Sequence, residues 1–454
     1  MGFFRPFSTK TKNSREEPKE PGCCPDGRQL KNWHWICGIA AGLFYVLFIW
    51  KNSFLVSGVR FFSLFDDGMI SMRYARNLAD GFGLRWNPGE APVEGYTNFL
   101  WTLYMAAIHL LPVAPSKTSL LVMLTGAVIL LGNLLVVKSM AERIAGKDSY
   151  MPLMAVFLTA FYYPLIYWTL RGMQVGFLCL LINAAILAAF RLEDRYSLAD
   201  VAWLTLACCA AVLTRPDAIV PVGVVGVFLL FVIWQHGFKP GYLSIPVAIA
   251  AVVAGQTAFR VAYYRDPLPN TYYLKMTGVT LLERGSRGLE VLCQVALYHL
   301  WPVLLILVVA LAMNFRRLLS PKVLLLLGIF AGQAAYSVYV GGDAWDWMLF
   351  SNRYLTIAMP ALFVALGLAV AMLCEFRQTA LMLTLPALGI VLWQQSLSYF
   401  EISSKTWHGP VLALAAGLSV AVGLGLMLVT TKRRIAPVKV SLPTILLVCL
   451  TMNI

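Results

Sequence analysis

Long apolar runs alternate with short polar loops along most of this chain. About 20 consecutive apolar residues suffice for a helix to cross the roughly 30 Å hydrocarbon core of a bilayer. On that basis we expect helices near residues 33–50, 118–137, 151–168, 174–190, 199–213, 216–234, 242–263, 291–312, 323–340, 354–373, 380–396, 410–430 and 440–454. The pattern predicts an all-α polytopic membrane protein with about 13 transmembrane helices and further helices beside the membrane on its outer face.

The apolar segment at residues 97–111 is harder to place, because it is short, contains Asn98 and His109, and is followed by Pro112. Cytoplasmic loops of membrane proteins carry an excess of Lys and Arg. If the segment does not span, six basic loops lie together in the cytoplasm, at residues 138–147, 191–195, 235–241, 314–322, 375–379 and 431–439. We therefore expect a helix lying at the outer interface, with the N-terminus inside and the C-terminus outside.

This topology places the longest polar segment, residues 51–117, on the outer face. Residues 264–290, 341–353 and 397–408 lie there as well. Carriers more often place polar groups on broken helices at mid-membrane, so this distribution favours chemistry at the outer surface. Residues 1–32 are polar and proline-rich, and we expect them to form a disordered cytoplasmic tail.

Composition agrees with the membrane assignment. The 454 residues are 59% hydrophobic and 13% charged, whereas a soluble protein has about 25% charged residues. This excludes a soluble enzyme, a disordered protein and a secreted disulfide scaffold. In a membrane protein, the net charge of +14 reflects the excess of Lys and Arg in cytoplasmic loops. Because the sequence has no basic stripe interleaved with aromatic residues, we expect no nucleic-acid binding. The nine cysteines show neither a C-x-x-C pair nor histidines at zinc-site spacing.

Two adjacent carboxylates, Asp66 and Asp67, open a helix-like stretch in the first outer segment. Carboxylates next to a bilayer are costly to desolvate unless they are used or paired. At 100° per residue, Asp66 shares a helical face with Arg73 and Asn77. Asp66 or Asp67 could instead serve as the N-cap of that helix.

After Asn77 the chain is rich in glycine and proline, which marks it as a loop. This loop returns the chain to the membrane near Thr97. Glu94, Tyr96 and Asn98 in this loop could line a polar pocket. Alternatively, these side chains hold the loop in place.

Six stretches of this chain show a family resemblance. Three lie in the first outer segment: Asp66-Asp67-x5-Arg73-Tyr74-Ala75-x-Asn77-Leu78, Gly81-x-Gly83-Leu84-x-Trp86-Asn87-Pro88-Gly89-Glu90 and Val93-Glu94-Gly95-Tyr96-Thr97-Asn98-x-Leu100-Trp101. Three come later: Leu213-Thr214-Arg215-Pro216-Asp217, Leu268-Pro269-Asn270-Thr271-Tyr272-Tyr273-x-Lys275, and Gly341-Gly342-Asp343 followed by Arg353-Tyr354-Leu355 and Pro360. Together they resemble the GT-C superfamily of membrane glycosyltransferases, and most closely the polyprenyl-phosphate-arabinofuranose-dependent arabinofuranosyltransferases. One departure is Gln174, where the family often has Glu.

The resemblance implies a GT-C catalytic transmembrane module at residues 33–380, with C-terminal scaffold helices at 381–454. It further implies an active site at the outer leaflet and a lipid-phosphate sugar donor. Asp66 would be the base that activates the acceptor, and Asp67 would orient the acceptor or help to hold a divalent cation. No cofactor is firmly implied.

Transfer from a polyprenyl-phosphate sugar needs cations around the leaving phosphate, and arginine is its natural partner. The candidates are Arg73, Arg76, Arg215, Lys275 and Arg353. Each has a structural alternative: pairing with Asp66 or Asp67 for the first two, a bridge to Asp217 for Arg215, and an interfacial position for the last two. The other candidate substrate contacts are Asn77, Glu94, Tyr96, Asn98, Asn270, Tyr273 and Asp343, the last of which could instead cap a turn.

The sequence thus predicts an enzyme of the bacterial inner membrane that transfers a sugar, D-arabinofuranose by resemblance, from a polyprenyl-phosphate donor. Its acceptor would be a glycan or a pilin-type glycoprotein at the outer face. A transferase for another lipid-phosphate sugar is the first alternative. The second is a transporter of lipid-linked sugars, which should show internal repeats that this sequence lacks.

Overall fold

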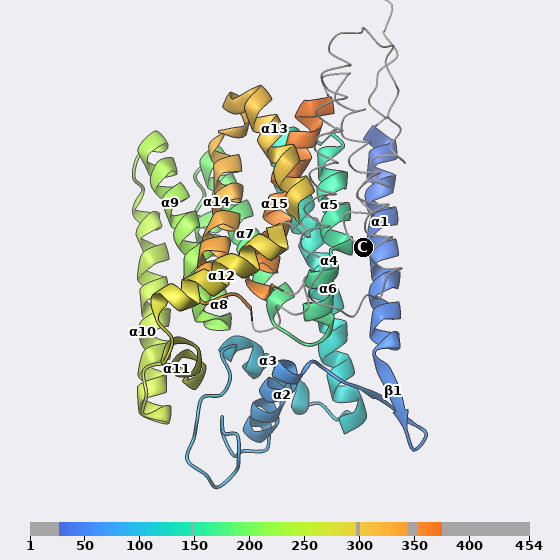
Figure 1. Cartoon of the computed structure of the whole chain (residues 1–454), viewed down its shortest axis with the longest axis vertical. Coiled ribbons are helices and arrows are strands. Elements are labelled where there is room, and N and C mark those ends of the chain that lie inside the picture. The colour runs from blue at the N-terminus through green and yellow to red at the C-terminus, as the bar shows by residue number, and fades with distance from the viewer. Residues whose placement is uncertain (1–26, 148, 297–299, 344–351, 375–454) are drawn as a thin grey trace, which may run out of the picture.

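The computed structural model describes residues 27–147, 149–296, 300–343 and 352–374 of the chain. Within these ranges it forms a bundle of helices with a short two-stranded hairpin (Figure 1). The spans expected at 380–396, 410–430 and 440–454, the scaffold region 381–454 and residues 1–26 of the tail lie outside the described residues. Helix α1 (Gly27–Lys51) begins inside the tail that we expected to be disordered.

The described part of the chain contains seven helical segments that are long and apolar enough to cross a membrane. They are Trp33–Lys51 in α1, α4 (Pro115–Ala145), α7 (Val175–Asp194), Pro216–His236 with α9 (Ile219–His236), Pro240–Tyr264 with α10 (Ser244–Tyr264), α14 (Pro321–Tyr339) and Arg353–Met372 in α15 (Arg353–Cys374). A bent pair of helices makes an eighth segment if it counts as one span. The chain is therefore a multi-pass membrane protein.

That bent pair replaces the single helix expected at 151–168. Helix α5 (Met151–Phe161) and helix α6 (Tyr163–Leu170) meet at an angle of 48°. Pro164 lies in the first turn of α6, where its missing N–H does no harm, but it cannot continue the hydrogen bonding of α5.

A second difference concerns the helix expected at 291–312. Two helices occupy this part of the chain, α12 (Leu281–Val295) and α13 (Trp301–Leu318). The side chain of Thr280 accepts from the backbone N–H of Glu283, whose own side chain accepts from the backbone of Thr280. This capping box starts α12 ten residues before the apolar run that we used to set the boundary.

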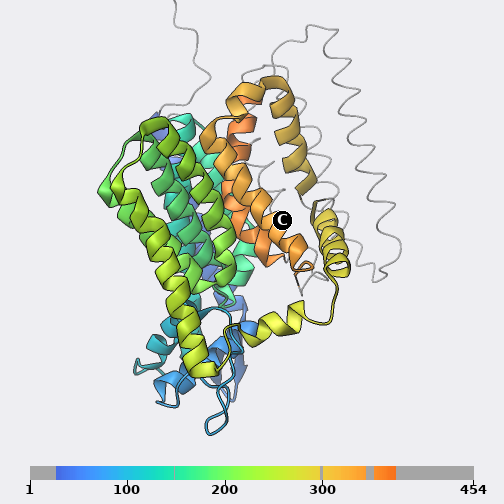
Figure 2. The same ribbon diagram turned by 90° about the vertical axis from the view of Figure 1, so that its left-hand side faces the viewer.

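Residues 97–111 do not span the membrane. They form α3 (Phe99–His109), which at 11 residues is too short to cross a bilayer. Both views place α3, α2 (Asp66–Ala79) and α11 (Asn270–Met276) at the same end of the bundle (Figures 1 and 2). The antiparallel hairpin of β1 (Ser53–Val56) and β2 (Val59–Phe62) lies there too.

Ion pairs show that several of the basic loops meet at the opposite end. Arg143 at the end of α4 pairs with Asp194 at the end of α7. Lys322 at the start of α14 pairs with the same aspartate at 2.6 Å and with Glu193 at 3.6 Å. Three loops that the charge rule assigns to one side therefore do lie together.

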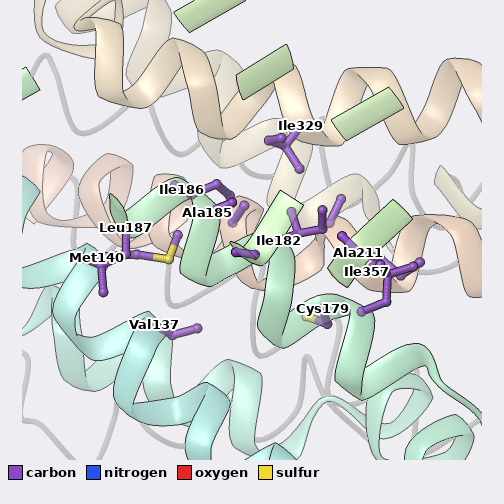
Figure 3. Packing of buried hydrophobic residues seen from close by; sticks show 14 of the residues in the cluster. Val137, Met140, Cys179, Ile182, Ala185, Ile186, Leu187, Ala211, Ile329 and Ile357 are labelled. Atoms are coloured by element: carbon purple, nitrogen blue, oxygen red, sulfur yellow. The ribbon is translucent and has the colours of Figure 1, made fainter. Parts of the chain in front are cut away.

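Close packing of small and branched apolar side chains holds the centre of the bundle together. Figure 3 shows residues of α4, α7, α8 (Leu198–Thr214), α14 and α15 in contact there, among them Ala185 and Ala211. Lipid is as apolar as these side chains, so close packing and buried hydrogen bonds hold such helices together. One such bond runs from Asn183 to Asn133 at 2.9 Å, and both side chains are fully buried.

Candidate active site

A cavity of about 330 Å³ opens where α2, the loop before α3, the α6–α7 turn, α10 and α11 converge. The α8–α9 junction, the end of α14 and the start of α15 complete its wall. The charged and polar side chains that line it include Asp67, Ser71, Asn98, Gln174, Arg215, Asp217, Arg260 and Arg353. The volume falls at the lower end of the range for small-molecule sites.

The α6–α7 turn fixes where α2 begins. The backbone N–H of Phe65 donates to the carbonyl of Arg171 at 2.8 Å, and Trp101 donates its indole N–H to the carbonyl of Gly172 at 2.9 Å. Gly172 has a φ of +86°, and a Cβ there would lie 2.6 Å from Leu64. Glycine is therefore required at this turn, which holds the start of α2 against the cavity.

The two adjacent carboxylates have different surroundings. Phe65 is the N-cap of α2, so neither aspartate has that role; both lie in the first turn, where the helix dipole favours negative charge. Asp66 is exposed and accepts from the backbone N–H of Asp67 at 2.8 Å. Asp67 lines the cavity, with 37% of its side chain exposed, and Asp66 is not among the lining residues.

Arg353 joins Asp67 to a second, deeper carboxylate. Its Nη1 donates to Asp67 Oδ2 at 2.6 Å, while its Nε and Nη2 donate to Asp343 at 2.9–3.2 Å. Asp343 also accepts from the backbone N–H of Arg353 and is buried. The paired aspartates therefore hold the guanidinium at the cavity wall. Asp343 itself is not a lining residue.

Arg215 lines the cavity at the junction of α8 and α9. Its guanidinium donates two hydrogen bonds to Asp217, at 2.7 and 2.9 Å. It also lies 5.7 Å from the centre of the Tyr354 ring. The structural alternative for Arg215, a bridge to Asp217, is therefore present, and the pair still faces the cavity.

Arg260 is a lining residue that our sequence analysis missed. It is 5% exposed, and its Nε donates to both oxygens of Glu94, at 2.9 and 3.1 Å. Its Nη2 is buried without a hydrogen-bond partner in the described part of the chain. The signal was present in the sequence, because Arg260 is the only charged residue of the apolar run at 242–263, and an ionisable residue inside a span is usually functional.

The loop that carries Glu94 and Tyr96 is fixed to the end of α10. Tyr264 donates to the carbonyl of Leu84 at 3.0 Å, and its hydroxyl lies 3.1 Å from that of Tyr96. Burial raises the pKa of Glu94, and the hydrogen bond from Arg260 opposes that rise. Burial also raises the pKa of Tyr96, so its hydroxyl keeps its proton. Tyr96 lines the cavity, while Glu94 lies behind Arg260.

Asn98 belongs to a buried uncharged network at the cavity wall. Its Oδ1 accepts from Ser71 at 3.0 Å and from Thr102 at 3.1 Å. Its Nδ2 donates to Oε1 of Gln174 at 3.1 Å. The network contributes neutral hydrogen-bonding groups beside the charged ones.

Three predicted site residues of α2 do not line the cavity, and two of them hold the following loop. Arg73 donates to the carbonyl of Trp86 at 2.9 Å and to Asn87 at 2.6 Å, with its guanidinium 4.2 Å from the Trp86 ring centre. Asn77 donates to the same carbonyl at 3.0 Å. Arg76 forms an exposed pair with Asp80 at 3.5 Å.

The predicted residues of α11 are placed at the side of the cavity. Asn270 is exposed, and the hydroxyl of Tyr273 donates to Asp266 at 2.7 Å. Neither lines the cavity, although Thr271 and Tyr272 between them do. Lys275 lies in α11, and its side chain is outside the described part of the structure.

Metal ligands do not gather around the carboxylate pair in the described residues, where no three His, Cys, Asp or Glu side chains form a group. A cation on Asp67 would have to displace or share its bond with Arg353. The predicted divalent-cation site at Asp66 and Asp67 therefore gains no further ligand from this geometry.

No protein-family model and no curated protein matches the chain. Among solved structures, ArnT from Cupriavidus metallidurans with bound undecaprenyl phosphate is similar at a TM-score of 0.53 and 12% identity, over 92% of this chain and 75% of that one. Archaeal oligosaccharyltransferase AglB from Archaeoglobus fulgidus, in complex with an inhibitory peptide and a dolichol-phosphate, is similar at a TM-score of 0.47 and 12% identity. The match covers 93% of this chain. This chain spans 56% of AglB. The likeness to ArnT shows that the chain has the GT-C fold, as the sequence motifs predicted.

Proposed function

We propose that this protein is a glycosyltransferase that moves a sugar from a polyprenyl-phosphate donor to a hydroxyl acceptor. The observation that carries the proposal is the cavity where Asp67, Arg215, Arg260 and Arg353 converge. An acceptor oxygen attacks the anomeric carbon of the sugar, and the bond between that carbon and the phosphate oxygen breaks. The acceptor proton passes to a carboxylate, and the products are the glycosylated acceptor and polyprenyl phosphate.

The phosphate needs cations as its charge develops, because the leaving oxygen takes the bonding electrons. Arg215 and Arg353 already make paired bonds to aspartates. Arg260 lines the cavity and bonds Glu94 through Nε alone, which leaves the rest of its charged guanidinium for the phosphate. We therefore propose Arg260 as the main phosphate contact, supported by the charge of the other two.

For the proton acceptor we propose Asp66, the residue that the motif resemblance implies, with Asp67 orienting the acceptor. Asp67 is held by Arg353, whereas Asp66 has no side-chain ion pair in the described residues. A carboxylate that is not bonded to a cation has its oxygens free to accept the proton of the acceptor hydroxyl. Asp67 lines the cavity, however, so the two must be compared directly.

The sugar we propose is D-arabinofuranose, on the strength of the six motif stretches. The acceptor would be a cell-envelope glycan or a pilin-type glycoprotein, at the outer face of a bacterial inner membrane. The lipid-phosphate donor class gains support from the solved structure of the similar ArnT, which holds undecaprenyl phosphate.

The test is a transfer assay with purified full-length protein, synthetic polyprenyl-phosphoryl-D-arabinofuranose and a short arabinan acceptor. The variants are Asp66→Asn, Asp67→Asn and Arg260→Gln, with Arg76→Gln as a matched control outside the cavity. Loss of a general base lowers turnover by roughly 10²- to 10⁴-fold. We expect that loss in Asp66→Asn and near-normal turnover in the control.

Other outcomes assign the roles differently. Normal turnover in Asp66→Asn with loss in Asp67→Asn would make Asp67 the base. No product from wild type with this donor, but product with another lipid-phosphate sugar, would replace arabinofuranose. Movement of intact donor across a liposome membrane without cleavage would instead indicate a transporter.

A further inference from the structure

The amide of Gln174 has an unusual position in the cavity wall. It is 1% exposed as a residue, yet it lines the cavity at the N-terminus of α7. Its Oε1 accepts from Asn98 Nδ2 at 3.1 Å. Within the described residues, its Nε2 makes no hydrogen bond, and this atom is not sealed away from the cavity as a buried unpaired atom would be.

Neighbouring groups determine which way this amide faces. Two hydroxyls, those of Ser71 and Thr102, converge on Oδ1 of Asn98. Nδ2 of Asn98 then faces Gln174 and donates to its Oε1. The two N–H donors of Gln174 are then the groups left for a ligand.

The turn that precedes Gln174 restricts its movement. The backbone N–H of Met173 donates to the carbonyl of Trp168 at 3.0 Å, and the carbonyl of Gly172 is held by Trp101. Gln174 itself is the N-cap residue of α7, and its carbonyl accepts from Leu178. A donor held this rigidly loses little conformational freedom when a ligand binds.

We infer that Gln174 is a specificity-determining residue that donates a hydrogen bond to a neutral oxygen of the transferred sugar. The inference rests on the proposed function and concerns the same cavity. A carboxamide donor suits an uncharged hydroxyl oxygen, whereas the phosphate has three guanidinium groups near it. Gln174 contacts the sugar and takes no part in the proton transfer.

The decisive variant is Gln174→Glu. A carboxylate keeps an oxygen for Asn98 but has no proton to donate once it is ionised, so the assay is run across pH 7 to 9. Gln174→Ala removes both contacts. Gln333→Ala is the matched control, because Gln333 is a 2% exposed amide on α14 that does not line the cavity.

Loss of one neutral hydrogen bond corresponds to roughly a tenfold change. We expect both Gln174 variants to lower kcat/KM by about tenfold or more, and the melting temperature of Gln174→Glu to fall because a buried carboxylate is costly to desolvate. The assay is repeated with monodeoxy arabinofuranosyl donors, each lacking a different hydroxyl. One of these donors should be used equally by wild type and Gln174→Ala, because its contact is already absent.

Two results would overturn the inference: unchanged kcat/KM in both Gln174 variants, or the same tenfold deficit with every monodeoxy donor, which would indicate a structural role. If wild type transfers no sugar, donor affinity is measured from the thermal shift that the donor produces. Donor binding that Gln174→Glu weakens would support the inference even though transfer failed. No binding by wild type would overturn the proposed function, and this inference with it.

Discussion

Arg353 donates to Asp67 at 2.6 Å although 286 residues separate them in the sequence. The same guanidinium holds Asp343, which is fully buried at its side chain. One arginine thus connects the first turn of α2 to the start of α15.

This arrangement predicts that Arg353→Lys is not a conservative change. Lysine carries its charge at one point and cannot reproduce the fork that reaches Asp343 and Asp67 together. We expect a loss of at least about 1.5–3 kcal/mol in the free energy of unfolding, the range for one hydrogen bond to a charged group. Thermal unfolding in detergent measures this, with Arg76→Lys as the exposed control. Equal melting temperatures for Arg353→Lys and wild type would refute the bridging role.

The Glu94–Arg260 pair allows stability to be separated from activity. Removing one partner of a buried ion pair costs about 3–5 kcal/mol, whereas replacing both with apolar residues is often nearly neutral. We therefore expect Arg260→Met and Glu94→Leu each to destabilise the protein, and the double variant to recover much of that loss. Sugar transfer should stay low in the double variant, because the Arg260 guanidinium is gone from the cavity wall. Recovery of transfer together with stability would show that Arg260 has only a structural role.

Gly172 tests the turn that positions α2. Alanine at this φ of +86° is strained, and its Cβ would also lie 2.6 Å from Leu64. Backbone strain of this kind costs about 1–2 kcal/mol, and overpacking adds about 1–3 kcal/mol. Gly81 has a φ of +84° with no atom within 4 Å of an added Cβ, so Gly81→Ala reports the strain alone. Gly172→Ala should lose more unfolding free energy than Gly81→Ala; equal losses would contradict the close packing on Leu64.

His109 gives the protein a pH-dependent stability. Burial at the end of α3 lowers the pKa of its imidazole below the ordinary value of 6.5, with a further contribution from Arg76. The unfolded chain therefore binds the proton more tightly than the folded one. Stability from the neutral imidazole is present above pH 6.5 and is lost as the pH falls from 6.5 through the folded pKa.

Melting temperatures between pH 5 and pH 8 check this prediction. His109→Gln stays neutral and should reduce the fall in melting temperature on the acid side. His236→Gln, an exposed control at the end of α9, should leave the curve unchanged. Identical acid-side curves for wild type and His109→Gln would remove His109 as the cause.

Apolar run length and loop charge were enough to predict a multi-pass helical membrane protein in which the short helix α3 does not span. Neither reports the angle between helices, so the 48° bend between α5 and α6 was missed. Thr280 and Glu283 carried a readable start signal for α12, but an apolar threshold does not detect a capping box.

For the candidate site, the motif stretches pointed to Asp67, Tyr96, Asn98, Arg215 and Arg353, which line one cavity. They also pointed to Arg73 and Asn77, which hold a loop. Helical spacing places a side chain on a face, but it does not say what covers that face. Arg260 was overlooked because it lies outside every motif, although a lone charge in an apolar span marks it.

The distance in sequence between Asp67 and Arg353 has a consequence for biosynthesis. Ribosomes add about 5–20 residues per second, so Asp67 emerges roughly 15–60 s before Arg353 is made. During that interval the carboxylate has neither its guanidinium partner nor the wall that α15 provides. The wall of the cavity is therefore complete only after the start of α15 has been synthesised and packed against the earlier helices.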